Sequence, residues 1–532
     1  MPQIKEPTDE QSKIINDNGN LVVIAKPGSG KTFTIVEKIN LISQTLYDYQ
    51  GVIAISFTKK ASDELEMRCK NRGAPRKQSF YGTIDSFYIN QIIIPFSRHL
   101  TGCLTQFDIK TSVNDIVEYK VLSKIKDGYK PELIEMLLSA LSKGYIFLDI
   151  SGETALYILE NVREAKEYLL AKYTHIFIDE YQDCGDIQHR IFMFLVNGGM
   201  TGVAVGDINQ AIYAFSNRYP KYLTSLLLVP KFSPYEITRN HRCHKSISDY
   251  SLKLLGINTA VTEENKRVYK VNLIGDEDSI AKSIGAYLPA IKERYEVCNN
   301  NRVAILCRNN STVQRVFNNI GLPCKLFQDT ELNHINSYWA RFFNDFLQCY
   351  YDPSVYNVDF VDRYFNEEAN YLSYQKALKI IKELFDLKEH QLVDEMPNFI
   401  KLVKMVYPKY ESTDVIDVFR EILATDEKLK SYTPAKDEEI NILSLHKSKG
   451  LEFDIVFHLD LYQWVMPPYQ ASKEDYEQSL NLHYVGLTRA RKVCYIMQGT
   501  KRHNSAGELK QANESEFLSK NNLQDFRKDV SW

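Results

Sequence analysis

The sequence lacks the features that mark membrane and secreted proteins. No apolar run among its 532 residues approaches the ~18 residues needed to cross a bilayer, and the segment from Met1 to Gln11 is polar and charged rather than an apolar signal segment. The nine cysteines contain no C-x-x-C pair, and their odd number fits reduced thiols better than a disulfide framework or a zinc site. We therefore expect a soluble, cytoplasmic protein without a membrane partner.

The chain also lacks an excess of charge of either sign. Lysine and arginine total 65 residues against 68 aspartates and glutamates, which leaves a formal net charge of −3. This balance excludes a protein that coats nucleic acid by bulk charge, so any contact with DNA must come from local basic and aromatic groups. A composition of 44% hydrophobic and 25% charged residues is that of an ordinary globular protein, long enough for three or four domains.

The N-terminal part has the pattern of an α/β unit. An apolar run from Leu21 to Ala25 is followed by a glycine-rich turn, a predicted helix from Lys31 to about Ile42, and a second apolar run from Val52 to Phe57. Further strands are predicted at Ile176–Ile178, Val203–Val205, Val303–Cys307, Ile440–Leu445, Ile455–Leu459 and Val493–Met497. The fold class is therefore α/β, with two cores of parallel sheets flanked by helices.

Two stretches with helical patterns interrupt these cores. Between Ile89 and Lys166, apolar residues recur at helical spacing and Pro131 is suited to open a helix; the apolar residues are Ile116, Val117, Val121, Leu122 and Ile125. No glycine occurs between Leu322 and Lys449, where a second stripe comprises Ala377, Leu378, Ile380, Ile381, Leu384 and Phe385. We predict a first core at 1–88 and 167–245 with an insertion at 89–166, and a second core at 246–321 and 436–532 with a reduced helical insertion at 322–435.

A phosphate-binding loop is predicted between the first strand and the first long helix. Small residues there let backbone N–H groups approach phosphates, Lys31 can reach the β and γ oxygens, and the Thr32 hydroxyl can bind Mg²⁺. The alternative is an accidental glycine-rich turn, and the first glycine of the general pattern is replaced by alanine. The predicted nucleotide-binding residues are Ala25, Lys26, Pro27, Gly28, Ser29, Gly30, Lys31 and Thr32.

Two carboxylates follow the strand Ile176–Ile178. Asp179 can hold Mg²⁺ through water, and Glu180 can orient or deprotonate the attacking water. Alone, such a pair could equally be a solvated strand end. Following a phosphate-binding loop, it indicates hydrolysis of ATP or GTP.

From this point the sequence resembles superfamily 1A DNA helicases of the UvrD/Rep/PcrA type. The run Asp179–Asp183 resembles their motif II, and seven other motifs follow the family's order. They are Thr8–Gln11 (Q motif), Ser56–Ala61 (Ia), Gly82–Phe87 (Ib), Val205–Asp207 with Gln210–Tyr213 (III), Arg239–Arg242 (IV), Leu445–Phe453 (V) and Tyr484–Ala490 (VI). The resemblance implies two RecA-like cores and an ATP hydrolase and DNA helicase that uses ATP and Mg²⁺.

The resemblance also implies roles for individual residues. Arg242 and Arg489 would contact the γ-phosphate and Gln210 would sense it, while Gln11 would read adenine and Glu452 would contact the ribose. His241 stands where the family usually has a tyrosine stacked on adenine. DNA contacts would come from Phe57, Thr58, Thr83, Tyr213, Phe215 and His446.

Two of these assignments have structural alternatives. Phe57 and Tyr213 could instead belong to the core. A basic stretch could meet DNA phosphates but is more often a solvated helix face; it comprises Lys59, Lys60, Arg68, Lys70, Arg72, Arg76 and Lys77.

Several details resemble the helicase subunit of Gabija antiphage systems. Asp85 replaces the usual histidine of motif Ib, His483 precedes motif VI, and the segment Ile92–Phe96 follows motif Ib. This resemblance implies an OLD-family nuclease as partner in a hetero-oligomer, in addition to single-stranded DNA or DNA ends. In motif III, Ser216 replaces the arginine that usually couples DNA to the γ-phosphate, and Arg218 lies two positions away. Three functions remain open: a helicase, a DNA-sensing ATPase that regulates a nuclease, and a nucleotide-binding scaffold.

Overall fold

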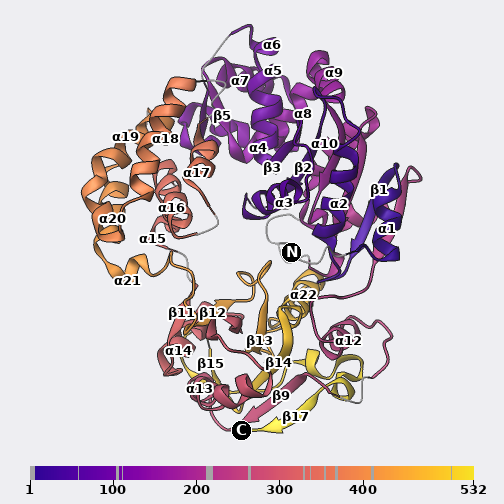
Figure 1. Cartoon of the computed structure of the whole chain (residues 1–532), viewed down its shortest axis with the longest axis vertical. Helices are drawn as coiled ribbons and strands as arrows, with labels where there is room; N and C mark the ends of the chain where they lie inside the picture. Colours follow the sequence, from indigo (N-terminus) through magenta and orange to yellow (C-terminus); the bar gives the residue numbers. More distant parts are fainter. Residues whose placement is uncertain are drawn as a thin grey trace. The chain divides into compact units, whose positions relative to one another are not determined.

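The computed structural model of the chain forms two compact units, Met1–Asn265 with Met466–Thr488, and Lys266–Val465 with Arg489–Trp532 (Figure 1). The structure describes residues 6–532 except 58, 104–106, 111, 211–219, 262–264, 328–329, 336, 353–354, 366–369, 409–411 and 505.

The first unit is built on a parallel sheet of six strands in the order β3-β2-β6-β7-β1-β8. The strands are β1 (Asn20–Ala25), β2 (Gly51–Ser56), β3 (Phe80–Thr83), β6 (Tyr173–Ile178), β7 (Thr201–Gly206) and β8 (Phe232–Ile237). Four of them contain the strands predicted from sequence, whereas β3 and β8, at the two edges, were not predicted. A sheet of this kind presents the carboxyl ends of its strands along one edge, where ligands of α/β proteins bind.

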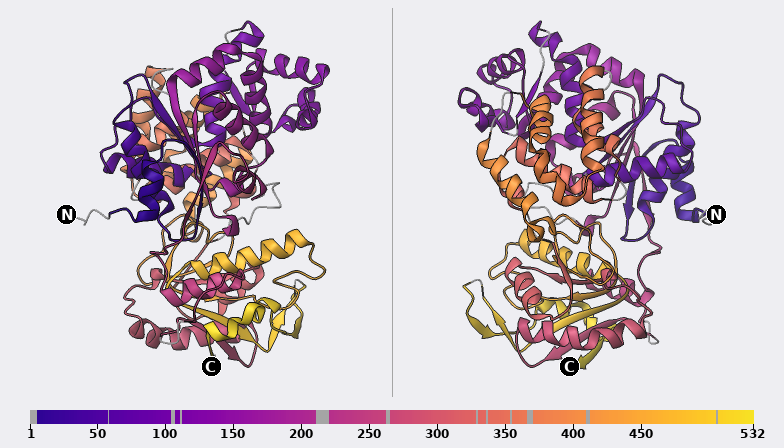
Figure 2. Two further views of the ribbon diagram at one scale, coloured as in Figure 1. Left: turned by 90° about the vertical axis from the view of Figure 1, so that its right-hand side faces the viewer. Right: turned by 60° about the vertical axis from the view of Figure 1, so that its left-hand side comes forward.

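Successive side chains of the central strands point to opposite faces of this sheet. Val22 faces one hydrophobic core, while Leu21 and Val23 face the other. Helices on both faces complete these cores, and Figure 2 shows the helices packed around the strands. The helices outside the insertion are α1 (Asp9–Asn16), α2 (Lys31–Ser43), α3 (Lys59–Asn71), α4 (Ile84–Phe87), α10 (Asp186–Asn197), α11 (Lys221–Leu226), α12 (Lys245–Leu254) and α22 (Lys473–Thr488).

The segment after α4 is largely helical, as predicted. It contains the π-helix Tyr88–Ile93, α5 (Ile94–Phe96), α6 (Arg98–Thr101), α7 (Pro131–Ser142), α8 (Ser151–Asn161) and α9 (Arg163–Lys172), with a small parallel pair of strands, β4 (Asp108–Lys110) and β5 (Tyr145–Phe147). Pro131 opens α7, as expected of a residue without a backbone N–H.

The predicted α-helical stripe from Ile116 to Ile125 is wrong in its period. Residues Val117–Asp127 form a 3-10 helix in which Tyr119, Leu122 and Ile125 are buried, whereas Val117 and Val121 are exposed. A 3-10 helix has three residues per turn, so positions three apart lie on one line along its surface. The apolar residues at 117 and 121 therefore fall outside the buried line.

The second unit contains a parallel sheet of seven strands in the order β11-β12-β10-β13-β14-β9-β17. The strands are β9 (Val268–Leu273), β10 (Val303–Cys307), β11 (Cys324–Leu326), β12 (Ile440–Ser444), β13 (Phe453–His458), β14 (Ala490–Gly499) and β17 (Lys528–Ser531). Helices α13 (Glu277–Arg294) and α14 (Asn310–Asn319) pack on it, and a two-stranded hairpin pairs β15 (Lys501–His503) with β16 (Leu509–Gln511). The two parallel sheets with flanking helices are the two RecA-like cores expected from the sequence.

Between β11 and β12 the chain forms a helical region with its own core. Its helices are α15 (Glu331–His334), α16 (Tyr338–Tyr351), α17 (Asn357–Tyr364), α18 (Tyr371–Phe385), α19 (Met396–Val406), α20 (Thr413–Ala424) and α21 (Asp426–Leu429). Aromatic side chains fill the core, with the Phe343 and Phe419 rings stacked at a centroid distance of 4.1 Å. The cluster shares no residue with the core of the adjacent sheet.

The nine cysteines all lie in the described part of the chain, and none of them forms a disulfide. No helix in the described part of the chain is long and apolar enough to cross a membrane.

Candidate active site

The predicted phosphate-binding loop connects the carboxyl end of β1 to the first turn of α2. Gly28 and Gly30 have φ angles of +68° and +84°, a backbone conformation that residues other than glycine rarely adopt. A Cβ on Gly28 would lie 2.4 Å from the Cβ of Arg242, and one on Gly30 would lie 2.6 Å from Nε2 of Gln11. The loop thus needs glycine at both positions because of its backbone conformation and its close neighbours.

We predict that Gly28→Ala weakens ATP binding and lowers the melting temperature. Forcing alanine into the left-handed region costs roughly 1–2 kcal/mol, and the contact with Arg242 adds to that. Gly73→Ala is the matched control, because Gly73 has φ +84° and no atom within 4 Å of the added Cβ. Thermal melts and ATP titrations of both variants separate backbone strain from the clash. Equal behaviour of the two variants would show that the contact with Arg242 does not matter.

Lys31 lies beside both predicted catalytic carboxylates. Its Nζ is 3.2 Å from Oδ1 of Asp179 and forms an ion pair with Oε1 of Glu180. Burial lowers the pKa of Lys31, but the two carboxylates raise it further, so the net shift is upward and the side chain remains charged. The structure therefore brings Lys31, Asp179 and Glu180 together at the end of β6.

A chain of hydrogen bonds links Glu180 to motif III. Nε2 of Gln182 donates to Oε2 of Glu180, and Oε1 of Gln182 accepts from the backbone N–H of Asp207 at 3.0 Å. The carboxylate of Asp207 accepts from Nε2 of Gln210 at 2.9 Å. Gln182 and Asp207 are buried, and burial raises the pKa of Asp207 to about 6 although the Gln210 hydrogen bond opposes this.

The roles of Gln182 and Asp207 were not predicted from the sequence. Both residues belong to the matched motifs, so the motifs could have indicated their importance. The hydrogen bond between them could not be predicted from the sequence. Glu180 itself has φ +57°, an uncommon backbone conformation for glutamate that is often found at active sites.

The Q motif and motif IV lie against the phosphate-binding loop. Nε2 of Gln11 donates to the carbonyl of Ser29 at 3.0 Å, and the backbone N–H of His241 donates to the carbonyl of Gly28 at 2.8 Å. Glu10 accepts from the backbone N–H of Thr238 at 2.9 Å, which ties α1 to the segment before motif IV. The first unit thus gathers four separate motifs around one loop.

Motif V and Arg489 of motif VI belong to the second unit, whereas Tyr484–Thr488 of motif VI belong to the first. Arg489 is 1% exposed, and its Nη1 donates to the carbonyl of Leu451 at 3.2 Å. Oε2 of Glu452 lies 3.4 Å from Nε of Arg491. Burial, and secondarily the charge of Arg308, lowers the pKa of His446 to about 4, so its imidazole is neutral at pH 7.

Among the predicted DNA-contact residues, the structure places two in the first unit. Phe57 is half-buried and packs against one core of the sheet, whereas the hydroxyl of Thr83 accepts from the backbone N–H of Ser86 and caps α4. Thr58, Tyr213 and Phe215 lie outside the described residues, as do Ser216 and Arg218. These contacts therefore stay predictions.

Four side chains of the basic stretch are paired with acids. The ion pairs are Arg68–Glu64, Arg72–Glu37, Arg76–Glu66 and Lys77–Asp48. Such pairing favours the interpretation as a solvated surface over a dedicated phosphate-binding surface.

The residues present fit a nucleoside triphosphate. The two glycines allow the left-handed backbone conformation of the loop, and the hydroxyl of Ser29 is buried in the loop without a hydrogen-bond partner among the described residues. The helix α2 begins at Lys31 and directs its first N–H groups to the loop. Fold and site together define a P-loop nucleoside triphosphatase with two RecA-like cores.

Comparison with known proteins identifies helicases to which the chain is similar. A model of the UvrD-like helicase C-terminal domain matches residues 353–500, and a model of an AAA domain matches residues 10–216. The Gabija protein GajB of Bacillus cereus (strain VD045) is 27% identical, over 93% of this chain and 96% of GajB. The ATP-dependent DNA helicase PcrA of Staphylococcus epidermidis (strain RP62A) is 21% identical, over 94% of this chain and 84% of PcrA. Over most of its length the chain is thus similar to UvrD-like ATP-dependent DNA helicases.

Proposed function

We propose that this protein hydrolyses ATP, as its Mg²⁺ complex, while bound to single-stranded DNA or DNA ends. The observation that carries the proposal is the position of Lys31 beside Asp179 and Glu180, next to a loop that requires glycine. Lys31 would bind the β and γ oxygens, while Thr32 and Asp179 would hold Mg²⁺, which neutralises charge on the phosphates. Glu180 would orient the attacking water, and Gln182 keeps its carboxylate in place.

The DNA contacts would be independent of sequence. The predicted set contains aromatic residues, and bases of every kind stack on aromatic rings. His446 is neutral at pH 7, so it would serve as a hydrogen-bonding or stacking group rather than as a phosphate-binding cation.

We further propose that the protein is the helicase subunit of a Gabija-type complex and serves an OLD-family nuclease such as GajA in a hetero-oligomer. The similarity to GajB extends over nearly the full length of both chains and supports this role. The substitution of arginine by Ser216 in motif III favours loose coupling between DNA stepping and hydrolysis. We therefore expect DNA-dependent ATP turnover with little unwinding by the isolated chain. This behaviour is that of a DNA-sensing ATPase that regulates a nuclease.

The test measures ATP turnover and strand displacement in the same tubes, on single-stranded DNA, tailed duplexes and closed circular duplex DNA. Turnover should rise with single strands or ends of any sequence, and DNA binding should weaken as salt increases because phosphate contacts release counterions. Adding this protein to an OLD-family nuclease of the GajA type should change the DNA cleavage by that nuclease. ATPase activity indifferent to all DNA forms would contradict the DNA-dependent function, and processive displacement by the chain alone would contradict the sensing role.

A further inference from the structure

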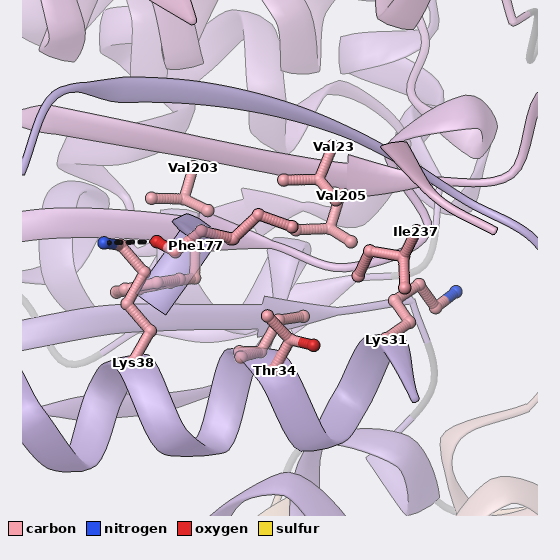
Figure 3. A pocket seen from close by; sticks show the side chains of 10 residues that line it. Val23, Lys31, Thr34, Lys38, Phe177, Val203, Val205 and Ile237 are labelled. Atoms are coloured by element: carbon pink, nitrogen blue, oxygen red, sulfur yellow. Dashed lines mark hydrogen bonds between the residues drawn. The ribbon is translucent and has the colours of Figure 1, made fainter. Parts of the chain in front are cut away.

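Lys38 is a buried cation on the helix that begins with Lys31. It is 2% exposed, and Figure 3 shows it two turns along α2 from Lys31, at the other end of a small pocket lined by Val23, Phe177 and other apolar side chains. An isolated ammonium in such surroundings is costly unless hydrogen bonds satisfy it. No motif of the sequence analysis includes this lysine.

Its hydrogen bonds go to the end of α1. Nζ donates to the carbonyls of Ile14 at 3.1 Å, Ile15 at 3.3 Å and Asp17. The last carbonyls of a helix have no partner within the helix and carry partial negative charge. An ammonium has three hydrogens, so Lys38 satisfies three of these carbonyls at once.

The same short helix carries the predicted adenine-reading residue at its other end. Gln11 donates to the carbonyl of Ser29 in the phosphate-binding loop, and Glu10 accepts from Thr238. An α-helix of eight residues is too short to be stable alone, so its position depends on its tertiary contacts. Lys38 adds three hydrogen bonds from α2 to its carboxyl end, beside the packing of Ile14 against Ile35.

We propose that Lys38 is a positioning residue of the nucleotide site, which caps α1 and thereby sets the position of Gln11 beside the loop. Lys38 does not touch the nucleotide in this proposal. It acts on the affinity for ATP and on the preference for adenine, not on the hydrolytic step. The proposal rests on the proposed function, because it assumes that Gln11 contacts the base.

The charge of Lys38 makes this position dependent on pH. Burial lowers the pKa of Lys38 to about 8, although the charge of Asp17 raises it. Of the groups facing it, Asp17 has a lowered pKa and is charged, His175 has a pKa of about 4 and is neutral, and Tyr235, which donates to Asp17, has a raised pKa. Lys38 is therefore charged at neutral pH and loses a proton as the pH rises through about 8. The neutral amine has two hydrogens for three carbonyls.

The test compares Lys38→Met with Lys13→Met, which removes an exposed lysine from α1 itself. Lys38→Met should raise KM for ATP about tenfold, as expected for lost hydrogen bonds to a charged group, and reduce the preference for ATP over GTP. The value of kcat at saturating ATP should stay within about twofold of that of the unmodified protein, since the carboxylates and Lys31 are untouched. Lys13→Met should match the unmodified protein in all three quantities.

Two further measurements separate positioning from general damage. The variant Gln11→Ala should raise KM similarly, and the double variant should be no worse than Gln11→Ala, because both changes act through the same contact with the base. In the unmodified protein KM should rise with pH through about 8 while kcat is constant, and in Lys38→Met KM should not change over this range. The pH dependence of KM in the unmodified protein is measured without any substitution, so it does not depend on whether the variant folds.

An unchanged KM and base preference in folded Lys38→Met would overturn the proposal, as would additive effects in the double variant. A fluorescent ATP analogue, titrated by anisotropy, reports affinity without turnover. If the unmodified protein binds this analogue but hydrolyses no ATP with any DNA, the proposed function fails while the role of Lys38 in binding is still measured.

Discussion

Replacing Arg489 by alanine is expected to lower ATP turnover by at least about 10³-fold while ATP affinity changes only a few-fold. The resemblance to helicase motif VI assigns its guanidinium to the γ-phosphate, where negative charge is redistributed in the transition state. An interaction made mainly in the transition state lowers kcat and spares ground-state binding. Phosphate release on single-stranded DNA gives kcat, and titration of a fluorescent ATP analogue gives the affinity.

The control for Arg489→Ala must account for burial. Arg489 is 1% exposed and donates to the carbonyl of Leu451, so truncation could also destabilise the second unit. Arg489→Lys keeps the charge and the aliphatic stem but lacks the planar fork, and we expect turnover between that of the unmodified protein and that of the alanine variant. Arg98→Ala removes an exposed arginine and should be silent. Normal turnover in a folded Arg489→Ala variant would remove this residue from the γ-phosphate site.

Glu180→Gln is expected to bind ATP and to lose about 10²–10⁴-fold in turnover, the range associated with general base catalysis. Glutamine has nearly the same shape and can still accept from Gln182, so the network to Asp207 should persist. It lacks the charge that orients and activates water. Lys31→Ala should differ by losing both ATP binding and turnover, because it removes the cation that meets the phosphates.

The matched control for Glu180→Gln is Glu135→Gln, the same change at an exposed position of α7. Binding by titration and turnover by phosphate release are measured for all three variants. If Glu180→Gln turns over ATP at the rate of the unmodified protein, the catalytic base is a different group. If it binds no ATP, the residue serves the binding site rather than the chemical step.

The sequence predicted the central strands because their apolar runs are buried on both faces. The strands it missed are mostly at sheet edges, where β8 alternates buried and exposed side chains and β17 is mainly exposed. Edge strands pair on one side only and need no continuous apolar run. β9 was missed although it is central, since it contains Lys270, whose charge is balanced by Glu514 and Asp529 from distant parts of the chain.

Those parts of the candidate site that consist of contiguous residues could be predicted from the sequence. The phosphate-binding loop and the pair Asp179–Glu180 each follow a buried strand, and the order of elements in an α/β fold places both at the same sheet edge. The hydrogen bond from Asp207 to Gln182 joins residues 25 positions apart, and the bonds from Lys38 to the end of α1 span 21 to 24 positions. No local sequence pattern predicts such pairs. Side-chain contacts of this kind depend on how the elements pack.

The helical region between β11 and β12 has a core that is separate from that of the adjacent sheet. Mutations inside that aromatic cluster are therefore buffered from the strands that carry motif V. During evolution such a region can gain, lose or replace helices to suit a different partner. Selection on the nucleotide chemistry meanwhile keeps both parallel sheets constant. A lineage can in this way adapt one inherited motor to new cellular tasks by remodelling a single segment.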